Sequence, residues 1–354
     1  MIQQTQNVET RKIQFTGGST YIISLPKKWI DRNNLKKGSS IKLHVEEDTL
    51  IITPADKPTV QTLGEALIKI SPKDNPASVI RRIVSAYLVG YSFIRIKTER
   101  QQPLIVQQRN AIKNFARHML IGTEILIDTS TELVLQILLS YPELSIQSAL
   151  RRMCIITVSM HKDAISALKT RDQQLARSVI DTDNEVDRFT LYIVRQLKTA
   201  VQNPQIVKEI GLTIARDCLG YRLVTKSVER TADHAVNIAE NALNLTQQLN
   251  AEVAQKIEEM SEVAITMFET AIDALLRQDF NLAESIIEKT DAVISLENDA
   301  IAVSQKSNIS EMANLRLAIE SIRRTAEYAA DIAEIVLNLT VESIITREQP
   351  AKSL

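Results

Sequence analysis

The spacing of apolar residues changes character twice along the chain. Over residues 1–54, short β-rich runs are separated by glycines and an acidic turn, a pattern that predicts strands. Over residues 55–144, runs at helical spacing alternate with short apolar runs, which predicts a small α/β domain. From residue 145 onward, apolar positions recur at helical spacing almost to the end, which predicts long amphipathic helices.

The first region predicts a small β module. Gly17-Gly18 and the acidic turn at residues 46–48 each connect two β-rich runs, and Pro26 is well placed to begin a helix of about two turns. Short strands in about fifty residues bury little apolar surface, so we expect this module to dimerise. The predicted elements are strands at Lys12–Phe15, Thr20–Ser24, Ile41–Val45 and Leu50–Thr53 and a helix at Lys27–Arg32.

The second region is expected to connect the first and the third. It contains no glycine-rich phosphate loop, so a nucleotide site is not expected there. The predicted helices are Val60–Ile70, Asn75–Val89 and Ile105–His118, and the predicted strands are Tyr91–Ile96 and Glu124–Ile127.

The third region contains an internal repeat. Ala167–Ile180 recurs as Ala274–Ile287, 107 residues later, and Glu229–Glu240 recurs as Arg323–Glu334, 94 residues later. Each copy predicts three long helices, so two tandem antiparallel three-helix bundles are expected. The bundles span 145–249 and 250–345, with helices at 145–170, 173–202 and 205–248 and at 251–278, 280–306 and 310–342.

Composition supports a mainly α protein. Of 354 residues only 8 are Gly and 9 are Pro, and aromatic residues make up 4%. Two cysteines exclude a disulfide framework. No apolar run reaches the roughly 20 residues that cross a bilayer, and the first 30 residues do not resemble a secretory signal, so we expect a cytoplasmic location.

Charge is divided unevenly between the regions. Residues 1–54 contain 8 Lys or Arg against 5 Asp or Glu, whereas residues 145–354 contain 23 against 30. Two copies of a basic module would present a footprint suited to duplex phosphates, although an ordinary solvated surface explains the charge equally well. The candidate DNA-binding residues are Arg11, Lys12, Lys27, Lys28 and Arg32.

The first bundle contains the candidate metal ligands. Asp183 falls on the apolar stripe of the second helix, and Asp187 lies one turn further. Glu229 and Asp233 have the same spacing on the third helix. Like charges four residues apart cost a few tenths of a kcal/mol, so two such pairs make a bound cation a hypothesis of about equal weight to a solvated acidic face. Carboxylate oxygens suit a divalent or ferric ion.

The first region resembles a known DNA-binding domain. Arg11-Lys12-Ile13, the run Ile22-Ile23-Ser24-Leu25-Pro26-Lys27-Lys28-Trp29-Ile30 and Leu35-Lys36-Lys37-Gly38 are similar to the AbrB/MazE/SpoVT swapped-hairpin domain. The resemblance covers about residues 8–54 and implies an intertwined dimer that binds DNA. A module that only dimerises is the alternative.

The repeated region resembles the PhoU family. The string Glu229-Arg230-Thr231-Ala232-Asp233 is similar to the Glu-Arg-Ile-Gly-Asp signature of that family, and the motif occurs twice. The resemblance implies tandem three-helix bundles that regulate phosphate uptake and bind multinuclear iron or zinc. It implicates Asp183, Asp187, Glu229 and Asp233 as ligands. With the AbrB-like front, the chain resembles the archaeal PhoU-like regulators.

The second copy departs from this motif. Arg323 and Glu327 correspond to Glu229 and Asp233, and Thr290 and Ile294 correspond to the two aspartates of the second helix. An arginine at a ligand position repels a cation, so we expect no metal cluster in the second copy.

These observations favour a regulator. The leading hypothesis is a homodimeric, DNA-binding transcription or signalling regulator of phosphate uptake, in which the bundles sense metal, phosphate state or a partner. The alternative is an adaptor that does not bind DNA and docks on a phosphate transporter or sensor. A di-metal oxidase would need Glu-x-x-His, and none of the 4 histidines has a Glu three residues before it, so an enzyme is not expected.

Overall fold

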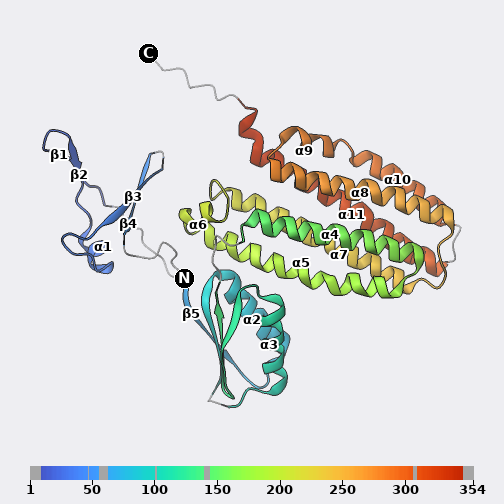
Figure 1. The fold of residues 1–354 in the computed structure, drawn as a ribbon, viewed down its shortest axis with the longest axis horizontal. Helices are drawn as coiled ribbons and strands as arrows, with labels where there is room; N and C mark the ends of the chain where they lie inside the picture. The colour runs from blue at the N-terminus through green and yellow to red at the C-terminus, as the bar shows by residue number, and fades with distance from the viewer. Residues whose placement is uncertain are drawn as a thin grey trace. The chain divides into compact units, whose positions relative to one another are not determined.

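A computed structural model of the chain describes residues 9–46, 48–55, 63–99, 102–138, 144–305 and 309–345. It divides into two compact units, Met1–Gln61 and Thr62–Leu354. We describe each unit separately (Figure 1).

The first unit consists of two antiparallel hairpins and one short helix, as the sequence pattern predicted. Gly17 and Gly18 form the first turn with φ of 65° and 79°, a left-handed conformation that glycine adopts without strain. Part of the predicted acidic turn, Glu47, lies outside the described residues. The elements are β1 (Gln14–Thr16), β2 (Thr20–Ile22), α1 (Lys27–Arg32), β3 (Ile41–Glu46) and β4 (Thr49–Pro54).

The second unit begins with an α/β domain of one four-stranded sheet and two helices (Figure 1). The strand order is β5-β6-β8-β7, with β5 and β6 parallel and β8 antiparallel to both of its neighbours. The apolar core lies between the sheet and the helices. The elements are β5 (Leu63–Ile70), α2 (Pro76–Val89), β6 (Tyr91–Thr98), α3 (Val106–Met119), β7 (Thr123–Asp128) and β8 (Glu132–Ile137).

One prediction for this domain is wrong. Residues 63–70, expected to be helical, form the edge strand β5, and residues 60–62 of the same predicted helix lie outside the described residues. Within β5 Ala66, Ile68 and Ile70 are less exposed than Glu65, Leu67 and Lys69, so burial alternates with the period of two that a strand imposes. The short run Leu67–Ile70 is compatible with the apolar spacing of a helix and with that of a strand. Pairing with β6 makes it a strand. Strand β8 was not predicted.

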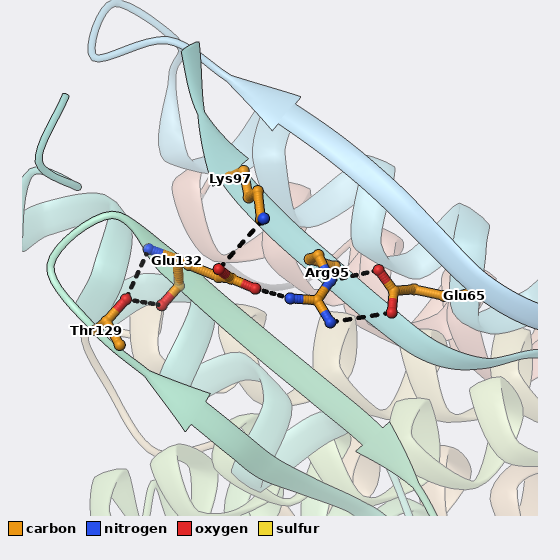
Figure 2. Close-up of polar contacts among 5 residues, drawn as sticks. All are labelled: Glu65, Arg95, Lys97, Thr129 and Glu132. Carbon is orange, nitrogen blue, oxygen red and sulfur yellow. Dashed lines mark hydrogen bonds and ion pairs between the residues drawn. The ribbon is translucent and has the colours of Figure 1, made fainter. Parts of the chain in front are cut away.

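A row of ion pairs crosses the sheet face opposite the helices (Figure 2). The Arg95 guanidinium on β6 bridges Glu65 on β5 and Glu132 on β8, and Lys97 Nζ lies 3.4 Å from Glu132 Oε2. At the β7–β8 turn the Glu132 amide donates to Thr129 Oγ1 at 3.1 Å. The row links three strands through their side chains and keeps this face polar.

The repeated region forms two helical bundles whose long helices run side by side (Figure 1). Two predicted helices are interrupted. The helix expected at 205–248 breaks around Gly211, which has φ of 87°, and the helix expected at 280–306 breaks at residues 288–289. The elements are α4 (Ile146–Thr170), α5 (Gln173–Ala200), α6 (Pro204–Glu209) and α7 (Asp217–Asn244), then α8 (Ala251–Arg277), α9 (Phe280–Ile287), α10 (Thr290–Ser304), α11 (Ile309–Thr340) and a 3₁₀ turn (Val341–Ser343).

The first turn of each repeat is built in the same way. Arg171 ends α4 and Gln278 ends α8, both in the left-handed conformation, with φ of 59° and 56°. The next residue caps the following helix. Asp172 Oδ1 accepts the amides of Gln174 and Leu175, and Asp279 Oδ1 accepts an amide in the equivalent turn. The repeat of 107 residues is therefore a repeat of turn chemistry as well as of sequence.

A buried histidine joins the two repeats. His161 on α4 is fully buried, and its Nε2 lies 2.9 Å from Ser261 Oγ on α8. Its Nδ1 lies 3.5 Å from Thr325 Oγ1 on α11. Burial lowers the pKa of His161 to about 4, so the imidazole is neutral and bonds to hydroxyl groups of the second repeat.

A buried arginine joins the α/β domain to the first bundle. Arg195 on α5 is 4% exposed and donates to the backbone carbonyls of Tyr87, Gly90 and Tyr91, at 3.2 Å for Gly90 and 3.0 Å for Tyr91. These carbonyls lie at the end of α2 and the start of β6. The guanidinium also lies 4.8 Å from the centroid of the Tyr87 ring. Helix α5 therefore forms a rigid link between the bundle and the sheet.

Candidate functional site

The packing of α5 against α7 brings the four predicted carboxylates together. Asp183 and Asp187 lie on α5, and Glu229 and Asp233 lie on α7. The four are close enough that the negative charge of Glu229 raises the pKa of each of the three aspartates. The two acidic pairs found by helical spacing therefore form one cluster.

Asp183 has a carboxylate oxygen that is buried without a partner. Its side chain is partly buried, and the unpartnered atom is Oδ1. Burial, followed by the charges of Asp187, Asp233 and Glu229, raises the pKa of Asp183 to about 7. An unpartnered carboxylate oxygen beside three more acids is a position that a cation would stabilise.

The two other aspartates show the same trend. Burial, then Glu229, raises the pKa of Asp187. Asp233 is more exposed, yet desolvation and Glu229 raise its pKa to about 6. Near pH 7 the cluster thus holds several negative charges that repel one another.

One lysine partly compensates this charge. Lys226 lies one turn before Glu229 on α7, and its ammonium group forms an ion pair with that carboxylate. It also lowers the pKa of both Asp187 and Asp233. Our sequence reasoning missed Lys226, although its spacing of three residues from Glu229 is the signal that could have found it.

The donor set of the cluster suits a hard cation, but the side chains are not arranged around one. Among the described residues, no three His, Cys, Asp or Glu side chains converge as they would on a bound metal ion. Glu229 is engaged with Lys226, while Asp183 Oδ1 has no partner. All four carboxylates would supply oxygen ligands, once Glu229 releases Lys226.

His234 faces away from this cluster. It follows Asp233 in sequence, but its ring lies 5.7 Å from that of Tyr328 on α11, centroid to centroid. The guanidinium of Arg230 also lies over Tyr328, at 5.9 Å from the centroid. His234 therefore belongs to the contact between the two repeats.

The N-terminal unit presents its cations and its apolar residues together on the surface. Arg11, Lys12, Lys27, Lys28 and Arg32 are all exposed, and of these Arg11 forms an ion pair with Glu9. Within residues 9–46 and 48–55 no side chain described is buried. The large apolar side chains with the greatest exposure are Ile13 (70%), Phe15 (59%), Tyr21 (73%), Leu43 (57%) and Val45 (77%).

The fold and the acidic cluster define a class of protein in which a small β module, an α/β domain and two tandem helical bundles follow one another along the chain. Comparison of sequences gives the family. The PhoU domain matches residues 150–242 and 257–336, and the antidote-toxin recognition domain of the bacterial antitoxin MazE matches residues 14–60. The chain belongs to the PhoU-type phosphate regulators and has a MazE/AbrB-like N-terminal domain.

Two solved structures are similar to a part of this chain. PhoU from Pseudomonas aeruginosa is 22% identical with a TM-score of 0.47, and the match covers 56% of this chain and 96% of that one. The phosphate transport system regulatory protein PhoU from Streptococcus pneumoniae is 17% identical with a TM-score of 0.48, over 57% and 96% of the two chains. No curated protein matches the sequence.

Two further findings bear on function. PhoU-family proteins are regulators rather than enzymes. In the part of the chain that the structure describes, no helix combines the length and the apolar character needed to cross a membrane.

Proposed function

We propose that this protein is a homodimeric regulator of phosphate uptake that binds duplex DNA through its N-terminal module and senses a signal through its helical body. In this role it is not an enzyme. The first repeat holds iron or zinc on Asp183, Asp187, Glu229 and Asp233, and the second holds none.

The observation that carries the dimer is the exposed apolar surface of the N-terminal unit. Two short hairpins and a six-residue helix expose side chains such as Phe15, Tyr21 and Val45. An isolated hairpin is marginally stable in water, and apolar patches on small modules mark interfaces. A second copy of the same unit would bury these residues, as in the MazE/AbrB-like family to which the module belongs.

The exposed cations supply the contact with DNA. In a two-fold dimer Lys27, Lys28 and Arg32 occur twice, giving six positive charges that suit the phosphates of a duplex. Antiparallel pairing of two modules also places the two sets about a symmetry axis, as recognition of a palindromic site requires.

The carboxylate cluster supplies the sensor. A bound metal would neutralise the four acids and connect α5 with α7. The same α5 reaches the α/β domain through Arg195, about two turns beyond Asp187. A change in how α5 packs on α7 therefore reaches the sheet through one rigid helix.

Binding of the full chain to its own promoter region tests the DNA part. We expect tighter binding than to a random duplex at matched salt, measured by fluorescence anisotropy. Lys27→Ala/Lys28→Ala/Arg32→Ala should weaken binding. It should also make the slope of log K against log salt concentration less steep, by about 0.9 for each phosphate that is no longer neutralised. Arg81→Ala/Arg117→Ala/Lys208→Ala removes the same charge at exposed positions of the second unit and should change little.

The result also decides between the two roles. Equal affinity for promoter and random DNA, with the dimer intact by sedimentation, would remove DNA binding and favour an adaptor that docks on a phosphate transporter or sensor. Sedimentation of the full chain as a monomer would refute the proposed dimer.

Elemental analysis of the purified full chain tests the metal part. We expect iron or zinc in the wild type and its loss in Asp183→Ala/Asp233→Ala. Asp181→Ala/Glu240→Ala removes two exposed acids from the same two helices and should retain the metal. Equal content in all three proteins would rule out this site.

A further inference from the structure

The second repeat lacks the donor set of the first. By the repeat spacings of 107 and 94 residues, the four acids of the first repeat correspond to Thr290, Ile294, Arg323 and Glu327. One carboxylate of four remains, and an arginine replaces another. These residues do not fit a metal ion.

A guanidinium bridges the two helices at that position. Arg323 Nε on α11 lies 3.1 Å from Glu297 Oε1 on α10, and Arg323 Nη1 is paired with Glu327 one turn along α11. The second oxygen of Glu327 accepts from Arg324 Nη1 at 2.9 Å. Arg323 therefore contacts carboxylates on both helices, the contact that a metal ion would make between α5 and α7.

The charges of two helical positions are exchanged between the repeats. In the first, Lys226 precedes Glu229 by three residues; in the second, Glu320 precedes Arg323 by three. Lys226 pairs with Glu229 on its own helix, α7. On the facing helix α5, Asp183 keeps an unpartnered oxygen. In the second repeat the cation crosses the interface, and Glu297 stands where the first repeat has Thr190.

The surroundings of Arg323 match this arrangement. A surface hollow of about 220 Å³ lies between α10 and α11, and its walls include Thr290, Ile294, Glu297, Arg323 and Glu327. Ile294 is 47% exposed beside it. In this wall Arg323 stands in place of one acid of the first repeat and Thr290 and Ile294 in place of two others, while the remaining carboxylates, Glu297 and Glu327, are paired with Arg323.

We propose that Arg323 is the fixed cation of the second repeat. It bridges α10 and α11 as a metal would bridge the equivalent helices, and it keeps metal out. The contact between α10 and α11 is therefore held by a permanent charge, and only the first repeat responds to metal. This inference rests on the metal part of the proposed function and adds the residue that makes the two repeats unequal.

The test restores the acids in a background without the first site. Asp183→Ala/Asp233→Ala is stripped with EDTA, exposed to Zn²⁺ or Fe³⁺ alone, and analysed for bound metal and melting temperature. With Arg323 intact we expect no metal and no rise in melting temperature. Adding Thr290→Asp, Ile294→Asp and Arg323→Glu should restore both. Arg316→Glu reverses an exposed charge on the same helix and should restore neither.

A second measurement examines the bridge without metal. Arg323→Met keeps an unbranched apolar stem but removes the guanidinium and its charge, and it should lower the melting temperature of EDTA-treated protein, whereas Arg316→Met should not. Metal bound by Asp183→Ala/Asp233→Ala with Arg323 intact would overturn the exclusion of metal, and an unchanged melting temperature for Arg323→Met would overturn the bridge. A wild type without metal would instead refute the proposed first site, and both measurements on Arg323 could still be made.

Discussion

Neutralising Asp183 should stabilise the metal-free protein, increasingly so as the pH rises. The pKa of this carboxyl is raised from 3.8 to about 7, first by burial and then by Asp187. The folded chain therefore holds a proton on Asp183 up to about pH 7, whereas the unfolded chain releases it near pH 3.9. A raised pKa contributes stability at low pH, and this contribution is lost progressively as the pH rises from about 3.8, the unfolded value, to about 7, the folded value. Asp183→Asn removes the loss.

The magnitude follows from the size of the shift. A change from 3.8 to about 7 corresponds to about 4 kcal/mol at 1.36 kcal/mol per pH unit. Because Asp183 is only partly buried, water and salt reduce this to about 2 kcal/mol. For a helical region of the size of residues 145–345, about 2 kcal/mol raises the melting temperature by about 4–8 °C.

His161 opposes this trend in the wild type. Its pKa is lowered from 6.5 to about 4 by burial, so its contribution to stability is lost as the pH falls from 6.5 towards 4. The pH profile of the wild type alone is therefore flattened. The difference between Asp183→Asn and wild type is informative because His161 is common to both proteins.

Melting followed by circular dichroism in EDTA, from pH 5 to pH 8.5, measures this difference. We expect a smaller difference at pH 5, where about a third of the contribution has been lost, and about 4–8 °C in favour of the variant above pH 7.5. Asp181→Asn, an exposed position two residues earlier, should follow the wild type at every pH. A difference that stays below about 1 °C, or that does not grow with pH, would refute the electrostatic account of the cluster.

Two further substitutions test how the second unit is held together. Arg195→Ala removes the side-chain donor from the carbonyls of Tyr87, Gly90 and Tyr91 and should cost about 3 kcal/mol, seen as a lower melting temperature that exposed Lys198→Ala does not reproduce; a shift below about 2 °C would contradict a structural link. Asp172→Ala removes the cap of α5 and should cost about 1 kcal/mol in urea unfolding; an unchanged midpoint would show that the turn does not depend on the cap.

Local chemistry was sufficient to predict most elements of this fold. The hairpins of the first unit follow from glycine turns and β-rich runs, and Pro26 precedes α1 as expected. In the repeats, Asp172 and Asp279 mark the same interhelix turn because an aspartate cap requires only the next two or three residues. The residues of the carboxylate cluster were also predictable, because helical spacing brings Asp183 and Asp187, or Glu229 and Asp233, onto one face.

The failures occur where a distant partner decides the outcome. The segment at residues 63–70 contains a run compatible with a helix, and it becomes a strand because β6 offers a parallel edge. The predicted helices at 205–248 and 280–306 are interrupted where the bundle must turn or bend. Periodicity describes a single element and carries no information about the element that packs against it.

By itself the sequence therefore determined most of the elements, since these depend on neighbours within one or two turns, and it also determined the repeat and the positions of the charges along the chain. Only the tertiary structure decided how those charges are used. Asp183 has an unpartnered oxygen because α5 packs on α7, Arg195 reaches three carbonyls of another domain, and Arg323 bridges to Glu297 from 26 residues away. The energy of a charge depends on its solvation and on partners brought close by folding, and neither can be read from spacing along the chain.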